Sequence, residues 1–124
     1  MLQSARITAF VATSDPARAR AFYEGTLGLK LVEDAPFALI FDTGGTTLRI
    51  AKVQSVVVTP YTTLGWSVTD IAQTVAALSA KGVAFERYPG LEQDADGIWP
   101  SPGGAMIARF KDPDGNTLSL AEGE

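Results

Sequence analysis

The secondary-structure signals of this chain occur twice in the same order, and this repetition limits the folds that it can adopt. In each half, an alternating apolar segment ends at an aspartate, Asp15 or Asp70, that suits a helix N-cap. Apolar residues with the spacing of a helix face follow, then a glycine, then three strand-like segments. The two aspartates are 55 positions apart. We therefore predict two tandem βαβββ modules, one of residues 5–53 and one of residues 61–121.

Turn residues separate the strand-like segments. Gly44 and Gly45 suit the positive backbone angles of a tight hairpin in the first half. In the second half a turn is predicted at residues 112–115, Asp-Pro-Asp-Gly, and a calcium site is disfavoured there because further oxygen ligands at the required spacing are missing. The expected strands are residues 5–13, 29–34, 37–42 and 46–52, and then residues 62–68, 83–88, 106–111 and 117–121.

Composition limits the size, the partners and the location of the protein. Of its 124 residues 46% are hydrophobic and 19% are charged, which suffices for the core of a single domain. The net charge of −4 repels nucleic-acid backbones and anionic membrane surfaces, so neither is expected as a partner. No apolar run approaches the roughly 20 residues that span a bilayer. The N-terminal residues also lack the pattern of a signal peptide, so we expect a cytoplasmic protein.

Two residue types are missing from the chain. Without cysteine there are no disulfides, thiolate nucleophiles or thiolate metal sites. Without histidine the chain also lacks the usual general base and the commonest metal ligand. Any metal would need oxygen ligands only, and any proton transfer would fall to a carboxylate, lysine, tyrosine or water.

Two segments within the duplicated order carry a family resemblance. Residues 109–120 have the sequence RFKDPDGNTLSL, and residues 21–29 have the aromatic-rich sequence AFYEGTLGL. With these segments the chain resembles the vicinal oxygen chelate superfamily of glyoxalases, bleomycin-resistance proteins and extradiol dioxygenases, over about residues 6–121. The resemblance implies an α+β fold in which the curved sheets of the two modules enclose a cleft. It also favours a homodimer.

The family's metal positions are substituted in this chain. Its enzymes hold a divalent metal with four side chains, typically His, Glu or Gln, on the first and last strands of each module. The resemblance places these positions at Thr8, Arg49, Thr63 and Ser119. A guanidinium cannot ligate a cation, and its positive charge repels one. We therefore expect no catalytic metal and no cofactor.

One charged residue, Arg49, is expected to face the cleft, because its apolar neighbours in the strand are expected to face the helices. Its guanidinium either binds a carboxylate, sulfonate or enolate of a ligand or pairs internally with Asp42 or Glu33. The two roles are not exclusive, and both stay open. Phe10 is expected on the same side as Thr8, where packing in the core is favoured over contact with a ligand.

Residues 89–104 contain many turn dipeptides and no periodicity, which predicts a long loop. Loops of this length often act as lids or binding segments. Trp99, within this loop, either stacks on a ligand or anchors the loop or a dimer contact, and both roles stay open. Trp66 alternates with apolar Leu64 and Val68, so we expect it in the core.

The favoured function is a metal-independent binding protein, similar to the bleomycin-resistance branch, that holds an aromatic or anionic organic ligand in the cleft. In this hypothesis the aromatic side chains stack on the ligand, Arg49 counters its charge, and the hydroxyl groups donate hydrogen bonds. The expected ligand-binding residues are Thr8, Phe10, Arg49, Thr63, Trp99 and Ser119.

The alternative is a metal-free lyase or isomerase in which Arg49 stabilises an enolate-like intermediate. A carboxylate or a tyrosine would then move the proton, and Glu33, Tyr61 and Tyr88 are the candidates. A metal-dependent enzyme is disfavoured because histidine is absent and the ligand positions are substituted. No residue is assigned a catalytic role from the sequence.

Overall fold

The computed structural model describes residues 1–123. The chain divides into two compact units, one of residues Met1–Val58 and one that begins at Thr59. Each unit contains a four-stranded sheet and one helical segment, and the four strands follow the same order in both sheets. The prediction of an α+β fold with two βαβββ modules is therefore confirmed. Among residues 1–123, no helix is long and apolar enough to cross a membrane.

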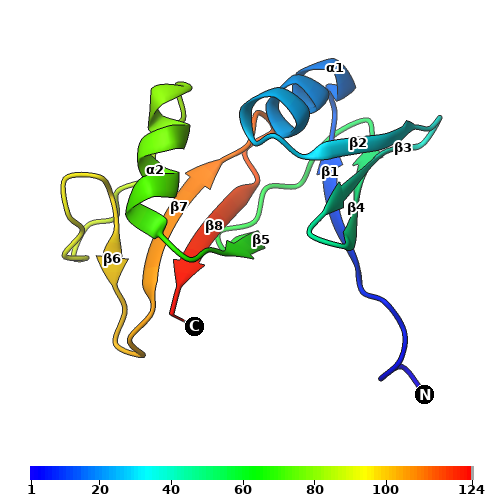
Figure 1. Ribbon diagram of the computed structural model, residues 1–124. Coiled ribbons are helices and arrows are strands. Elements are labelled where there is room, and N and C mark those ends of the chain that lie inside the picture. Colours follow the sequence, from blue (N-terminus) through cyan, green and yellow to red (C-terminus); the bar gives the residue numbers. More distant parts are fainter. Residues whose placement is uncertain (124) are drawn as a thin grey trace. The chain divides into compact units, whose positions relative to one another are not determined.

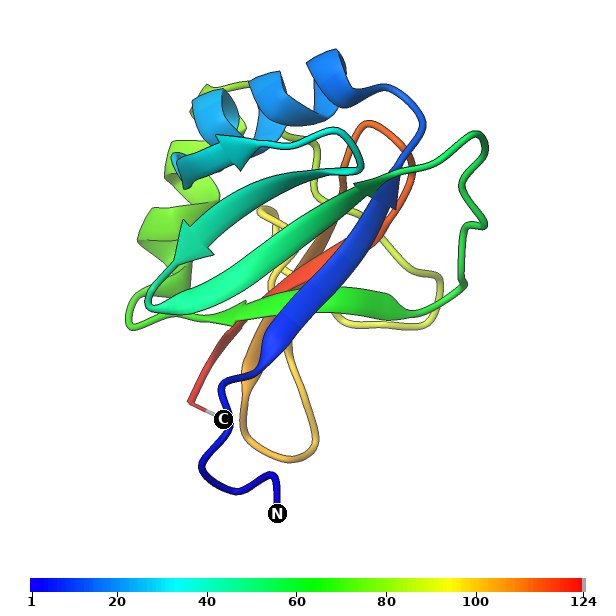
Figure 2. The ribbon, with the colours of Figure 1, turned by 90° about the vertical axis from the view of Figure 1, so that its right-hand side faces the viewer.

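In the first unit the strands follow the order β1-β4-β3-β2 across the sheet. β1 runs parallel to β4, and the other neighbours are antiparallel (Figure 2). The short helix continues directly into a π-helical turn. The elements are β1 (Thr8–Thr13), α1 (Pro16–Arg20), η1 (Ala21–Thr26), β2 (Lys30–Asp34), β3 (Ala38–Thr43) and β4 (Thr46–Lys52).

The local signals of the first unit act as expected. Asp15 caps α1 by accepting a hydrogen bond from the backbone N–H of Arg18 at 3.2 Å. Gly28 follows the helical segment with a φ of 73°, in the left-handed region that suits glycine. Tyr23 is buried and contacts Phe41 of β3, with ring centroids 6.1 Å apart. These aromatic rings therefore join the helical segment to one face of the sheet.

In the second unit the strands follow the corresponding order β5-β8-β7-β6, with β5 parallel to β8. Figure 1 shows the helix of this unit against the sheet formed by β7 and β8, with which it is in contact. The elements are β5 (Thr62–Ser67), α2 (Ile71–Ala80), β6 (Trp99–Pro100), β7 (Met106–Lys111) and β8 (Thr117–Glu122).

Two carboxylates accept hydrogen bonds from backbone N–H groups in the first turn of α2. Asp70 caps the helix by accepting from the backbone N–H of Gln73 at 3.1 Å. Glu122, at the end of β8, accepts from the backbone N–H of Ile71 at 2.9 Å. Both carboxylates lie at the positive end of the helix dipole, where negative charge is stabilising. The helix is thus joined to the last strand of its own sheet.

The turn between β7 and β8 is structural, as predicted. Asp112 is buried and accepts hydrogen bonds from the backbone N–H groups of Asp114 and Asn116 and from the Asn116 side chain. Gly115 has a φ of 90° and donates its backbone N–H to the Asp112 carbonyl oxygen at 3.0 Å. Asp112 therefore directs its carboxylate at its own turn.

The strand predicted at residues 83–88 is wrong. Within this segment only Phe85 forms a β-bridge, to Phe110 of β7. The strand that pairs with this edge of β7 is β6. The outer edge of β7 is divided between two short partners: Phe85 and Glu86 lie beside its C-terminal half, and β6 lies beside its first residues. The loop predicted at residues 89–104 therefore contains a short strand.

Candidate functional site: a cationic pocket in the second unit

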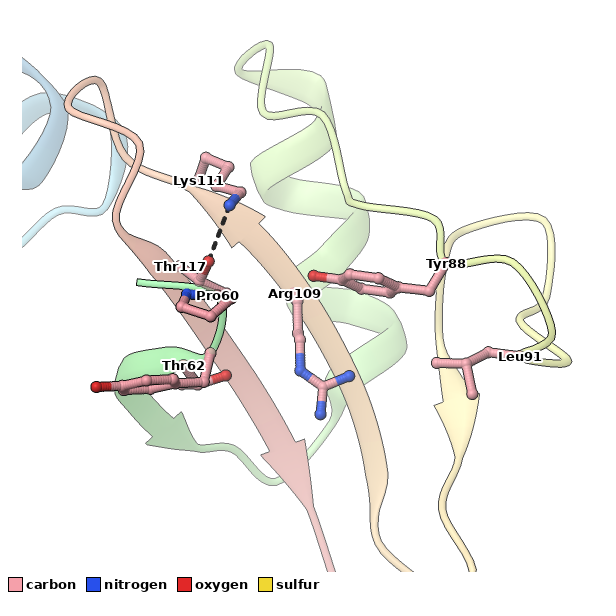
Figure 3. Close-up of a pocket in the computed structure, with 8 residues that line it drawn as sticks. Pro60, Thr62, Tyr88, Leu91, Arg109, Lys111 and Thr117 are labelled. Carbon is pink, nitrogen blue, oxygen red and sulfur yellow. Dashed lines mark hydrogen bonds between the residues drawn. The ribbon is translucent and has the colours of Figure 1, made fainter. Parts of the chain in front are cut away.

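The second unit contains a pocket of about 540 Å³ on its sheet (Figure 3). Its walls come from the segment that leads into β5, from the segment that follows Phe85, and from β7 and β8. The described residues that line it include two cations and two phenols and no acidic residue. They are Pro60, Tyr61, Thr62, Tyr88, Leu91, Arg109, Lys111 and Thr117.

The period of β7 directs its two cations into the pocket. Ala108 and Phe110 are buried, so Arg109 and Lys111 lie on the opposite face of the sheet. The Lys111 ammonium donates a hydrogen bond to the Thr117 hydroxyl at 3.0 Å, across the β7-β8 pair (Figure 3). One of the two cations is therefore already held by the protein.

Arg109, unlike Lys111, contacts an aromatic ring instead of a hydrogen-bond acceptor. Its guanidinium carbon is 5.7 Å from the centroid of the Tyr88 ring, within range of a cation-π contact. In the described part of the second unit, no carboxylate lies within ion-pairing distance of Arg109, and its side chain makes no hydrogen bond. Its N–H donors are therefore available to an acceptor in the pocket.

Tyr88 keeps its proton at neutral pH. Its partial burial raises the pKa of the phenol above the ordinary value of 10.0, and the nearby Glu86 carboxylate raises it further. The positive charge of Arg109 acts in the opposite direction without reversing the shift. The Tyr88 hydroxyl is therefore a hydrogen-bond donor at neutral pH and not a base.

The side-chain amide of Gln93 closes the segment that carries Tyr88. Its Oε1 accepts from the Tyr88 backbone N–H at 2.7 Å. Its Nε2 donates to the carbonyl oxygens of Glu86 at 2.8 Å and Gly97 at 2.9 Å. Arg87 adds hydrogen bonds to the carbonyl oxygens of Gln93 and Asp94. These bonds satisfy backbone groups that a regular strand would otherwise pair, and they fix the wall that contains Tyr88 and Leu91.

The structure brings together the three residues predicted in the first unit. Thr8, Phe10 and Arg49 share the sheet face opposite the buried Val11, and Phe10 and Arg49 are partners in the β1-β4 register. Phe10 is 62% exposed, so the favoured interpretation that it packs in the core is wrong.

The internal partners considered for Arg49 are not used. Within residues 1–58, no carboxylate lies within ion-pairing distance of its guanidinium, so the pairing with Asp42 or Glu33 is wrong. β3 places Asp42 opposite Thr47 and places Ile40 opposite Arg49. The register therefore offers Arg49 an apolar neighbour across the strand pair.

The three residues predicted in the second unit lie near the pocket but do not line it. Ser119 is the register partner of Arg109, and Trp99 pairs with Ile107, two positions before Arg109 on the same face. Thr63 lies at an irregularity in the pairing of β5 with β8, and its hydroxyl donates to the Thr117 carbonyl oxygen at 3.2 Å.

The residues at the family's metal positions do not fit a divalent cation. Thr8 and Arg49 are in the first unit, Thr63 and Ser119 are in the second, and none is a carboxylate or an imidazole. Among residues 1–123 there is also no cluster of three or more acidic residues that could hold a metal ion. The donor chemistry of the chain therefore disagrees with the metal chemistry that the resemblance implies.

Three residues of this region were not expected from the sequence: Arg109, Lys111 and Gln93. The signal for the two cations was the alternation in residues 106–111, where buried Ala108 and Phe110 direct their neighbours to the other face. No comparable signal exists for Gln93, because its role depends on a loop that folds back on itself.

The similarity to known proteins covers nearly the whole chain. The family described as Glyoxalase/Bleomycin resistance protein/Dioxygenase superfamily matches residues 5–120. No curated protein matches the sequence. The solved structure of lactoylglutathione lyase from Agrobacterium tumefaciens is 20% identical, with a TM-score of 0.74 over 97% of this chain and 94% of that chain.

Two further solved structures share the fold. A superfamily member from Sphaerobacter thermophilus DSM 20745 is 23% identical, with a TM-score of 0.75 over 98% of this chain and 99% of that chain. TnmS3, an antibiotic binding protein from Streptomyces sp. CB03234, is 24% identical, with a TM-score of 0.71 over 98% of each chain. At these identities the likeness concerns the fold. Because the family match covers nearly all of the sequence, the chain belongs to the Glyoxalase/Bleomycin resistance protein/Dioxygenase superfamily.

Proposed function

We propose that the protein is a metal-independent small-molecule binding protein of the glyoxalase/bleomycin-resistance type that holds an aromatic or anionic organic ligand. The observation that carries the proposal is the pocket of the second unit, in which Arg109 and Lys111 face two tyrosines without an acidic residue in the lining. A pocket of about 540 Å³ is within the range of small-molecule sites. Positive charge concentrated in a chain of net charge −4 favours an anion at this position.

The apolar part of the lining supports an organic ligand. Pro60 and Leu91 offer aliphatic surface, and Tyr61 and Tyr88 offer aromatic surface. The similar antibiotic binding protein, TnmS3, supports binding as the activity, whereas the similar lactoylglutathione lyase supports catalysis. The raised pKa of Tyr88 keeps its phenol protonated at neutral pH, so it can donate a hydrogen bond to a bound ligand.

The residues expected from the sequence remain part of this proposal. Phe10 offers an exposed aromatic ring. The guanidinium of Arg49 forms no ion pair within residues 1–58. Ser119 and Trp99 share the sheet face of Arg109. We further propose a cytoplasmic homodimer. Exposed apolar side chains in the first unit, such as Phe37 and Val32, support the dimer, and sedimentation velocity tests it.

The proposed function is tested by titrating the purified protein with a panel of aromatic carboxylates and polycyclic antibiotics, before and after dialysis against a chelator. Binding is followed by calorimetry. We expect saturable, one-to-one binding of at least one compound, with the same affinity after chelation. Binding that appears only after a divalent metal is added would contradict the proposal. A panel that yields no saturable binding would also contradict it.

A further inference from the structure

We infer that Arg109 and Tyr88 form an oxyanion subsite that selects aromatic carboxylates over their neutral analogues. This inference rests on the proposed function and narrows it to one ligand class. It also moves the charge-recognising group from Arg49 of the first unit to Arg109 of the second.

Three cations of the second unit lie on or beside the pocket, and the protein uses two of them. Arg87 donates to two backbone carbonyl oxygens of the segment closed by Gln93. Lys111 donates to the Thr117 hydroxyl. Arg109 is partly buried and has no acceptor in the described part of that unit. Its guanidinium lines the pocket, so its N–H groups can donate to a bound acceptor. A ligand oxyanion would provide such an acceptor.

The contact with Tyr88 leaves the guanidinium able to bind. A cation-π contact uses the ring face and does not consume the N–H donors of the arginine. The view of Figure 3 shows the Arg109 side chain extending from β7 between Tyr88 and Leu91 on one side and Pro60 and Thr62 on the other. Its donors thus face the space that these residues enclose.

The geometry of the acceptor follows from the donor. A guanidinium presents two parallel N–H groups that match the two oxygens of a carboxylate. The protonated Tyr88 hydroxyl is a further donor in the same pocket. Lys111, held by Thr117 and exposed, adds attraction for an anion without a second fork of donors. The set fits a single carboxylate better than a polyanion.

The part of the ligand that follows the carboxylate meets a mixed surface. Leu91 and Pro60 provide apolar walls, and the tyrosine rings provide flat ones. A planar ring attached to the carboxylate covers these walls without introducing rotatable bonds, which limits the entropic cost of binding. The ligand class is therefore an aromatic acid.

The test compares two ligands of the same shape, naphthalene-2-carboxylate and naphthalene-2-carboxamide, by calorimetry at low ionic strength. We expect the carboxylate to bind about 10- to 100-fold more tightly, because the guanidinium then pairs with an anion and not with an uncharged amide. Arg109→Gln is expected to reduce this ratio to near one, because it weakens binding of the carboxylate far more than binding of the carboxamide. Arg109→Lys keeps the charge and should retain only part of the ratio.

Arg18→Gln is the matched control. It removes one positive charge from an exposed position on α1 and should leave the ratio unchanged. Thermal unfolding shows whether each variant is folded, and Arg109→Lys preserves the test if Arg109→Gln does not fold. A wild-type ratio near one would overturn the inference, and so would a ratio that survives in Arg109→Gln. In both cases binding of the carboxamide leaves the proposed function standing. Failure of the wild type to bind either compound or any member of the panel would overturn both.

Discussion

The two units share a strand order and differ at one edge of the sheet. In the first unit the edge strand β2 has five residues and pairs with β3 over most of its length. In the second unit the corresponding edge strand β6 has two residues, and the segment around Phe85 forms a single β-bridge to β7. The chain released from this edge carries Tyr88 and Leu91 to the wall of the pocket. The shorter edge strand thus leaves a segment that forms part of a pocket wall.

A segment that leaves a sheet must pair its backbone groups elsewhere. In the second unit a side chain does this: Gln93 satisfies a donor of Tyr88 and acceptors of Glu86 and Gly97. The first unit needs no such side chain at β2, because β3 supplies the partners. We therefore predict that changes beside the short edge strand of the second unit affect both stability and ligand binding, whereas changes beside β2 in the first unit affect stability alone.

The largest expected effect comes from truncating one core phenylalanine in each unit. Phe41 contacts Tyr23 in the first unit, Phe110 contacts Phe85 in the second, and both phenylalanines are fully buried. Phe41→Ala and Phe110→Ala should each lower the free energy of unfolding by about 3–5 kcal/mol in urea titrations followed by circular dichroism. Only Phe110→Ala should also weaken binding of aromatic acids, because Phe85 anchors the start of the segment that carries Tyr88. Equal loss of binding in the two variants would remove the distinction between the units.

The next effect concerns the side chain that replaces the strand. Gln93→Ala removes three hydrogen bonds to backbone groups and should lower the free energy of unfolding by about 1–3 kcal/mol. Hydrogen exchange of the Tyr88 amide should become faster, because its acceptor is gone. Gln73→Ala is the control, since Gln73 is exposed on α2 and its side chain makes no hydrogen bond in the described part of the second unit. Unchanged exchange at Tyr88 in Gln93→Ala would show that the segment is held by other contacts.

The fold could be predicted from the sequence because its signals are local. Asp15 and Asp70 cap helices with their own side chains, and Gly28 and Gly82 adopt the positive φ that ends each helical segment. These interactions span a few residues, so they can be recognised without knowing the rest of the structure. Their repetition then indicated two modules.

The candidate site could be predicted only in part. The alternation that directs Arg49 away from the buried face was recognised. The same alternation around Phe110 was not used, although residues 106–111 were predicted as a strand. Phe10 was assigned to the core, since residue type alone favours burial of an aromatic ring, yet β1 places it on the exposed face. The role of Gln93 depends on chain reversal over several residues, and an amide side chain carries no signal for it.

A smaller effect tests what the two units have in common. Asp15→Ala and Asp70→Ala each remove the acceptor of one backbone N–H in the first helical turn, and each should lower the free energy of unfolding by about 1 kcal/mol. Substitution by asparagine, which also caps helices, should restore most of the loss in both units. If alanine lowers stability at only one of the two positions, the caps are not equivalent despite their similar geometry.

The smallest effect is a difference in how the units respond to pH. In the first unit, the hydrogen bond from Lys52 lowers the pKa of Asp34 below its ordinary value of 3.8, so the stabilisation is present above that value and is lost as the pH falls through the lowered pKa. In the second unit, burial raises the pKa of Tyr88 above 10.0, so its contribution is complete below pH 10 and is lost as the pH rises through the raised pKa.

Substitutions at Asp34 and Tyr88 test these two effects separately. Asp34→Asn should flatten the acidic limb of a plot of unfolding free energy against pH, and Tyr88→Phe should flatten the alkaline limb. Each variant should leave the other limb as it is in the wild type. Because Tyr88 lines the pocket, a bound aromatic acid should also delay its ionisation further, which absorbance at 295 nm measures as the phenolate forms. An alkaline limb unchanged in Tyr88→Phe would assign that limb to another group and leave the two units alike in their response to pH.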